Sequence, residues 1–279
     1  IPRLESNFKS LNLTDQIEEL FIGSIKDFNP KNHFDLVIAE GFLNTLPDRN
    51  NLLESLMELC GETGGLIINY DDRYGGYIEL LKSCILKKVC SLSGFDFRSG
   101  ESLLLAKKLF KDSFDKLNTS RPFKAWWEDQ LVNPFASCIW SLDEIIKIAE
   151  KQKFLCYSNS PILVNPNLFE WYKNIANVEN NNLNIMQTWR DAFAYIISGK
   201  KDYWKSFIPA ETKLVECIFD HTQSIADYIS NDQAKEFELE FPPELGEFLN
   251  KQNSTYFHSL ANELEDIYLV LNNGSSNQI

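Results

Sequence analysis

Residues 34–72 constrain the fold of this chain most, because they have the pattern of a strand, a helix, a glycine-rich turn and a second strand. Two short apolar runs, Leu36–Ile38 and Leu66–Ile68, have the composition of strands buried on both faces of a sheet. Between them, apolar residues recur at helical spacing over residues 52–60. The glycines of residues 61–65 are expected to end that helix and turn the chain. A unit of this length predicts a right-handed parallel crossover of an α/β sheet.

Ligands of open α/β sheets bind beyond the carboxyl ends of the strands. After the first predicted strand come Glu40, Gly41 and Phe42. We interpret Glu40 as lining a ligand pocket and Gly41 as letting the loop approach closely. The alternative for Glu40 is a carboxylate that caps the next turn.

The second predicted strand is followed by three candidate catalytic residues, Asp71, Asp72 and Tyr74. Carboxylates beside a tyrosine can position a nucleophile or act as general base. The alternative is a polar turn before a helix, with Asp72 as its N-cap. The glycine pair that follows favours this turn.

These features resemble the fourth and fifth strands of class I S-adenosylmethionine-dependent methyltransferases. That family has an FDLV-type strand, a leucine-rich helix and a strand that follows two glycines, as residues 34–68 do. Residues 3–28 resemble the helix and third strand that precede them, with Ser24 and Ile25 near the adenine of the cofactor. The resemblance implies a Rossmann-like α/β methyltransferase sheet, S-adenosylmethionine as cofactor and S-adenosylhomocysteine as product. The cofactor-binding residues that it implies are Ser24, Ile25, Glu40, Gly41 and Phe42.

The glycine-rich loop that the family wraps around the methionine end of the cofactor has no counterpart in residues 1–60, which contain no G-x-G spacing. We expect this loop, and the acidic residue that binds the ribose, upstream of Ile1. The resemblance implies methyl transfer to a small-molecule or peptide-borne nucleophile, with positioning as the main source of catalysis. Two alternatives stay open. One is a non-catalytic binding or scaffold protein on a methyltransferase-like fold, and the other is a different nucleotide-binding α/β protein, such as a dehydrogenase.

The chain divides into two predicted regions: a methyltransferase-like α/β domain over residues 1–165, with an insertion at about residues 91–135, and a mostly helical region over 166–279. Turn and charge patterns predict a capping box at Ser141–Glu144, a linker over 174–184 and a frayed tail over 272–279. A strand is predicted over 154–158, and an acidic extended segment over 235–243. Helical periodicity marks residues 77–89, 103–114, 141–149, 186–198, 203–207, 214–229 and 260–271.

The predicted insertion contains a cluster of aromatic and charged residues that forms a candidate substrate lid. Its members are Arg121, Trp126, Trp127, Asp129 and Asn133. Aromatic rings with a guanidinium and a carboxylate can cover a bound substrate. The alternative is structural: tryptophans that fill the core and an arginine–aspartate pair that holds a loop.

Composition argues against several classes of partner. The net charge of −13, from 27 basic and 40 acidic residues, argues against a broad nucleic-acid interface. The six cysteines lack C-x-x-C spacing and the three histidines are far apart, so no metal site is expected. No signal peptide and no apolar run of membrane-spanning length are visible. The sequence therefore predicts a reduced, cytoplasmic protein with no nucleic-acid or membrane partner.

Overall fold

The unit predicted from residues 34–72 forms a strand–helix–strand crossover. A computed structural model describes residues 2–117, 119–133, 135–159, 181–199, 208–232 and 237–273. In it, β1 (Phe34–Ala39) and β2 (Cys60–Ile68) are parallel neighbours joined by α2 (Arg49–Glu58). The described part is mixed α/β with 61% helix, and its sheet has two strands. The larger methyltransferase-like sheet therefore stays a prediction.

The glycines before Leu66 lie in β2 and do not end the helix as predicted. Helix α2 ends at Glu58, one residue before its C-cap. Phe34 pairs with Cys60, but Leu36 pairs with Gly65, so β2 bulges between these two pairs. A Cβ atom at Gly64 would lie 2.6 Å from the carbonyl oxygen of Phe34. The bulge thus needs a glycine because the two backbones approach closely.

One face of the sheet is covered and the other is exposed. Helices α2 and α6 (Leu142–Lys151) contact each other and bury the same face, which carries Val37 and Ala39. On the opposite face Leu36 is 53% exposed and Ile38 is 60% exposed. The prediction that these strands are buried on both faces is therefore wrong for the described part of the chain. Apolar composition alone does not determine how many faces of a strand are covered.

Two further predicted strands, one within residues 3–28 and one over residues 154–158, do not form. Residues 3–28 contain α1 (Pro2–Ser10) and 3₁₀ turns, with no strand. Residues 154–158 carry no strand pairing. Their backbone binds side-chain amides: the Cys156 N–H donates to Asn182 Oδ1 at 2.7 Å, and Asn182 Nδ2 donates to the Phe154 carbonyl at 3.2 Å. Carboxamides thus replace a neighbouring strand here.

The remaining described chain is helical, and most of the predicted helices are confirmed. Helix α6 begins after Ser141, but no capping box forms, because the Ser141 hydroxyl contacts the carboxylates of Asp143 and Glu144 at 2.5 and 2.9 Å. The other helices are α3 (Tyr77–Ser93), α4 (Gly100–Asp115), α5 (Phe123–Trp126), α7 (Asn181–Asp191), α8 (Phe193–Ser198), α9 (Thr212–Ser230), α10 (Pro243–Asn250) and α11 (Thr255–Asn273). None of the helices described combines the length and apolarity needed to cross a bilayer.

Several predicted segments fall partly or wholly outside the described residues. The predicted helix over 203–207 lies outside them, as does most of the predicted linker. The last residues of that linker, 181–184, belong to α7 and are helical. The predicted tail begins inside α11, which continues to Asn273.

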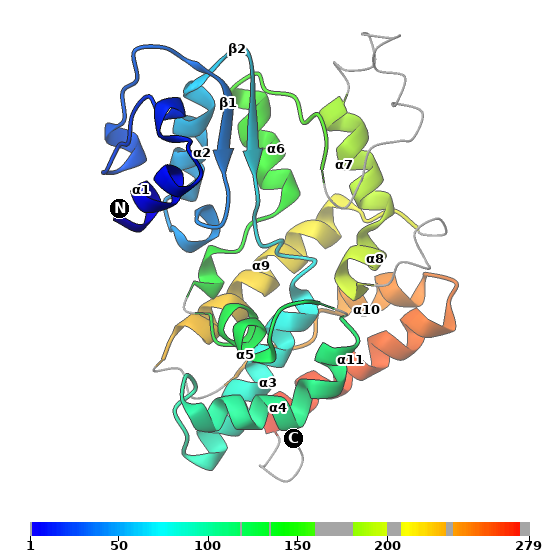
Figure 1. Ribbon diagram of the computed structural model, residues 1–279. Helices are drawn as coiled ribbons and strands as arrows, with labels where there is room; N and C mark the ends of the chain where they lie inside the picture. Colours follow the sequence, from blue (N-terminus) through cyan, green and yellow to red (C-terminus); the bar gives the residue numbers. More distant parts are fainter. Residues whose placement is uncertain are drawn as a thin grey trace.

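The larger hydrophobic core joins helices from both predicted regions. Helix α3 contacts α9 and α11, and its Tyr77 and Leu81 are buried with Ile218 and Phe257. In Figure 1 the strands lie beside α2 and α6 at one end of the molecule, and α9 crosses between them and α3, α4 and α11. The carboxyl end of β2 leads directly into α3, so the strand ends lie where the two parts of the molecule meet.

Candidate functional site

A cleft lies between residues 21–28 and the loop that follows β1. Its volume is about 700 Å³. Three of the five residues predicted to bind a cofactor, Ser24, Ile25 and Phe42, line it. Gly41 precedes Phe42 directly, and Glu40 is exposed at the end of β1. The structure thus brings together residues that lie on either side of β1 in sequence.

The walls of the cleft are mainly apolar and aromatic. Phe21 and Phe28 lie on it with their ring centroids 5.0 Å apart, and Phe42 is 37% exposed. Leu46 and Leu52 complete the apolar lining. Flat apolar walls of this kind suit a planar ring, because aromatic faces bind by stacking. Sequence reasoning missed these flanking residues, although the two phenylalanines on either side of Ser24 were a visible signal.

The rim of the cleft carries an ion pair. Lys26 contacts Asp48, and this contact lowers the pKa of the Asp48 carboxyl. Ser24 is the N-cap of the 3₁₀ turn Ile25–Asp27, and its hydroxyl oxygen accepts the N–H of Lys26 at 3.3 Å. A hydroxyl that accepts at its oxygen keeps its own proton free to donate. The cleft therefore offers one oriented hydroxyl and a charged rim beside an apolar wall.

The two strand ends are held together by side chains of residues that follow β1 and β2. The N–H of Gly41 donates to Asn69 Oδ1 at 2.6 Å, and Asn44 Nδ2 donates to Asp71 Oδ2 at 2.5 Å. Gly41 has φ of +79°, with no atom within 4 Å of an added Cβ. The left-handed backbone at Gly41 favours glycine, and the predicted close approach of this loop to a ligand stays a prediction. These contacts fix the loop that presents Phe42.

Asp72 and Tyr74 are built into the turn between β2 and α3. Asp72 Oδ1 accepts the N–H groups of Tyr74 and Gly75 at 3.0 and 2.6 Å. Burial raises the pKa of Asp72 to about 6, although these two N–H groups act in the opposite direction. Tyr74 is fully buried against Trp189 and Phe193. Neither residue lines the cleft. Asp72 stabilises the turn before α3, as the turn interpretation predicts, but the N-cap of α3 is Gly76 and not Asp72.

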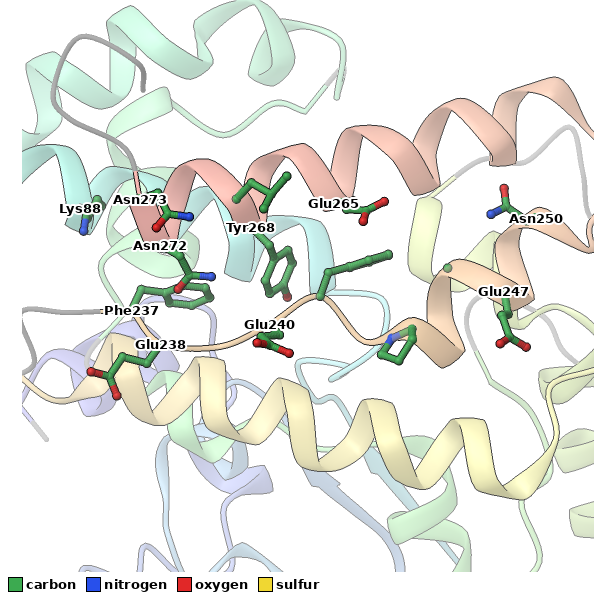
Figure 2. A pocket seen from close by; sticks show the side chains of 14 residues that line it. Lys88, Phe237, Glu238, Glu240, Glu247, Asn250, Glu265, Tyr268, Asn272 and Asn273 are labelled. Carbon is green, nitrogen blue, oxygen red and sulfur yellow. The ribbon is translucent and has the colours of Figure 1, made fainter.

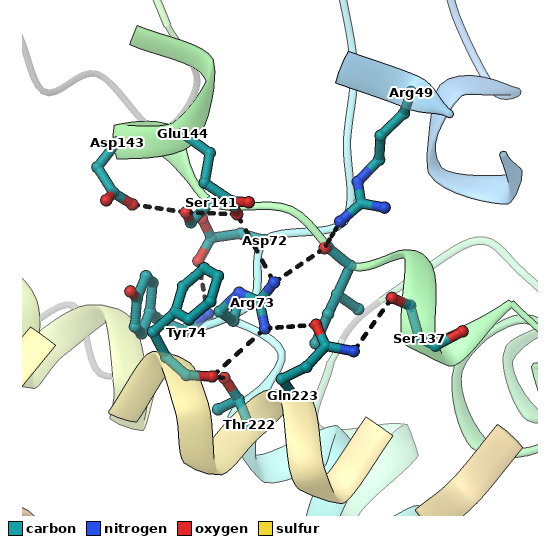
Figure 3. Close-up of polar contacts among 12 residues, drawn as sticks. Arg49, Asp72, Arg73, Tyr74, Ser137, Ser141, Asp143, Glu144, Thr222 and Gln223 are labelled. Carbon is teal, nitrogen blue, oxygen red and sulfur yellow. Dashed lines mark hydrogen bonds and ion pairs between the residues drawn. The ribbon is translucent and has the colours of Figure 1, made fainter. Parts of the chain in front are cut away.

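Arg73, between these two residues, is a buried hub that connects the strand end to α6 and α9 (Figure 3). It is 1% exposed. Its guanidinium donates to Gln223 Oε1 at 3.1 Å and to the Ile139 carbonyl at 3.3 Å, and it lies 3.6 Å from Glu144. It also lies 3.9 Å from the centroid of the Phe219 ring. Sequence reasoning gave Arg73 no role, because its partners lie up to 150 residues away.

The predicted substrate lid lies in the helical part of the molecule and does not line the cleft. Trp126 and Trp127 are buried, and Trp126 packs on Phe114 and Phe123. Arg121 pairs with Asp129 at the surface, and Asn133 Oδ1 accepts the N–H of Phe135 at 2.8 Å. This arrangement agrees with the structural alternative to a substrate lid, in which the tryptophans fill a core and the ion pair holds a loop.

Potential metal ligands and cysteines are also located among the described residues. No group of three or more His, Cys, Asp or Glu side chains there converges on a possible metal position. The six cysteines are free, and four of them are buried. Burial raises the pKa of the Cys84 thiol, which disfavours the reactive thiolate.

Neither a family model, nor a curated protein, nor a solved structure matches this chain.

Proposed function

We propose that this protein binds S-adenosylmethionine and transfers its methyl group to a small-molecule or peptide-borne nucleophile. The observation that carries the proposal is the cleft beyond the carboxyl end of β1. It is lined by Ser24, Ile25 and Phe42, three residues that the resemblance to class I methyltransferases assigns to the cofactor. Its position agrees with the general location of ligand sites in parallel α/β units.

The lining residues fit the adenosine half of the cofactor. Phe42 and Phe28 offer aromatic faces on which a purine can stack, and Leu46 and Leu52 exclude water from that wall. The Ser24 hydroxyl can donate to a ring nitrogen of the base. S-adenosylmethionine itself supplies the methyl group on a positively charged sulfur. The protein's contribution is then to hold the base and to align the acceptor.

The strand ends next to the cleft are the proposed place of the acceptor. Asp71, held by Asn44, and the exposed carboxylate of Glu40 lie there. A carboxylate in this place can orient an acceptor N–H or O–H and take its proton. Asp72 and Tyr74 have no part in this proposal, because both are tied into the packing of the turn.

Calorimetric titration of adenosine, S-adenosylhomocysteine and S-adenosylmethionine into the protein tests the proposal. We expect all three to bind, and Phe42→Ala to weaken their binding about fivefold, because a stacked ring contributes on the order of 1 kcal/mol. Phe135→Ala is the matched control, since Phe135 is 44% exposed and lies outside the cleft. Absence of binding to the wild-type protein would refute the proposal.

The alternative is a non-catalytic binding protein on a methyltransferase-like fold. Two observations favour it: the missing G-x-G spacing in residues 1–60 and the structural use of Asp72 and Tyr74. Binding of adenosine alone, with no gain in affinity from the methionine half, would support this alternative. A nicotinamide dinucleotide included in the same titrations tests the dehydrogenase interpretation.

A further inference from the structure

A second hollow, which we call the acidic groove, lies in the helical part of the molecule. It runs between α10, α11 and the extended segment 237–242, and its volume is about 960 Å³ (Figure 2). It shares no lining residue with the cleft beside β1. The site proposed above for methyl transfer therefore gives this groove no role.

The lining of the groove carries an excess of negative charge. Glu238, Glu240, Glu247 and Glu265 lie along it, and Lys88 is its one basic residue. Glu247 forms an exposed ion pair with Lys251 at 3.5 Å. For the other three carboxylates no ion pair is found within the part of the chain that the structure describes. The groove thus presents negative charges that the described residues leave uncompensated.

These carboxylates are spread along the groove and do not converge on one point. No cluster of three potential metal ligands occurs among the described residues. A metal ion needs several oxygen ligands at about 2–2.6 Å, which separated carboxylates do not provide. An extended ligand with several separate positive charges suits this spacing better.

Two buried aromatic side chains line the groove and anchor it to the hydrophobic core. Phe237 and Tyr268 are buried beneath it, and the Tyr268 hydroxyl contacts Tyr77 at 2.9 Å and His221 at 2.5 Å. Above them Leu269 is 56% exposed, although it lies among the carboxylates. An exposed leucine in a hollow gives an apolar side chain of a ligand a surface to cover.

Most main-chain groups of the extended segment have no hydrogen-bond partner among the described residues. Among the described residues, the one hydrogen bond to the backbone of residues 237–241 runs from Asn272 Nδ2 to the Leu239 carbonyl, at 3.0 Å. The other N–H and C=O groups of this segment have no protein partner there. Extended peptides bind such segments through main-chain hydrogen bonds, with specificity supplied by side-chain contacts.

From these observations we propose that the acidic groove binds an extended, lysine- or arginine-rich segment of a partner protein. Its cationic side chains pair with Glu238, Glu240 and Glu265, and an apolar side chain between them covers Leu269. Charge complementarity over several separated positions sets the specificity and the rate of association.

Fluorescence anisotropy with a labelled peptide of Lys-Leu-Lys-Ser repeats tests the proposal. The double variant Glu240→Gln/Glu265→Gln should bind the peptide at least about tenfold more weakly than the wild-type protein. The matched control is Glu263→Gln/Asp266→Asn, which removes two charges from exposed positions of α11 outside the groove. The control should keep wild-type affinity, and Leu269→Ser should weaken binding with no change of charge.

Three outcomes would overturn the proposal. The first is no binding of the peptide to the wild-type protein, and the second is an equal loss in both double variants, which would indicate unspecific attraction to an acidic protein. The third is full competition by spermidine at the peptide's own concentration, which would reassign the groove to free polyamines. All substituted side chains are exposed, so the circular dichroism spectra of the variants should match that of the wild-type protein. Titration of S-adenosylmethionine into the same variants shows whether binding at the cleft is unaffected, so that failure of the groove proposal can be told apart from failure of the cleft proposal.

Discussion

Two adjacent carboxylates at the end of β2 have different surroundings. Asp71 accepts the side-chain amide of Asn44 near the strand ends. Asp72 is turned toward the N–H groups of Tyr74 and Gly75 inside the turn. Burial raises the pKa of Asp72 to about 6, the nearby Asp143 acts in the same direction, and Arg73 acts against both. Asp71 is thus a candidate for orienting an acceptor, whereas its neighbour Asp72 has a structural role.

The raised pKa of Asp72 predicts a pH dependence of stability. Between about pH 4 and 6 the folded protein keeps a proton that the unfolded chain has released, so the free energy of unfolding falls as pH rises through this window. The expected loss is on the order of 2–3 kcal/mol. Asp72→Asn should remove this component, which urea denaturation at several pH values would measure. Equal pH slopes for wild-type and variant protein would contradict the assignment.

At the scale of elements, the carboxyl end of α9 is held by a lysine of α3. Lys87 is 5% exposed, and its Nζ donates to the carbonyls of Tyr228 and Asn231 at 2.5 and 2.6 Å. It also lies 4.5 Å from the centroid of the Tyr228 ring. The last carbonyls of a helix lack partners within the helix, and a cation there also interacts favourably with the helix dipole.

Lys87→Met should destabilise the protein by about 2–4 kcal/mol, because partly buried carbonyls at the end of α9 would lose a charged donor. Lys108→Met on α4 makes the same chemical change at an exposed position and should alter stability by less than about 0.5 kcal/mol. Thermal and urea unfolding of both variants would measure the difference. Equal stability of the two variants would show that Lys87 does not hold the end of α9.

For the whole molecule, the main structural contrast is between a large helical core and a sheet covered on one face. The helical core joins α3 to α8, α9 and α11 through fully buried aromatic and aliphatic side chains. The smaller core lies between the sheet, α2 and α6. Arg73 and the residues around it connect the two parts. The cleft belongs to the part with the sheet and the acidic groove to the helical part.

Adjacent residues of β1 provide a test of this one-sided arrangement. Val37 is 9% exposed and Ile38 is 60% exposed. Val37→Thr should cost about 1–3 kcal/mol, since it buries a hydroxyl in an apolar core. Ile38→Thr should change the unfolding free energy by less than about 0.5 kcal/mol. Comparable losses in chemical denaturation would mean that the second face is also covered.

Local pattern determined much of the secondary structure. Short apolar runs were sufficient to predict β1 and β2. Helical periodicity was sufficient to predict α2, α3, α4, α9 and α11, because it reports which face of a helix is buried. The same signal failed for residues 154–158, where the amides of Asn181 and Asn182 bind the backbone in place of another strand. It also failed at the glycines before Leu66, which serve a bulge and not a helix end.

The sequence by itself determined most of the elements that form in the described chain, and that the ends of β1 and β2 would be polar. Tertiary structure alone decided several contacts: it placed Phe21 and Phe28 on the cleft, turned Tyr74 into the core, and buried Arg73 among partners from two distant helices. The physical reason is that periodicity depends on neighbours along the chain. Clefts, buried charges and grooves depend instead on how elements pack across long separations, which no local pattern encodes.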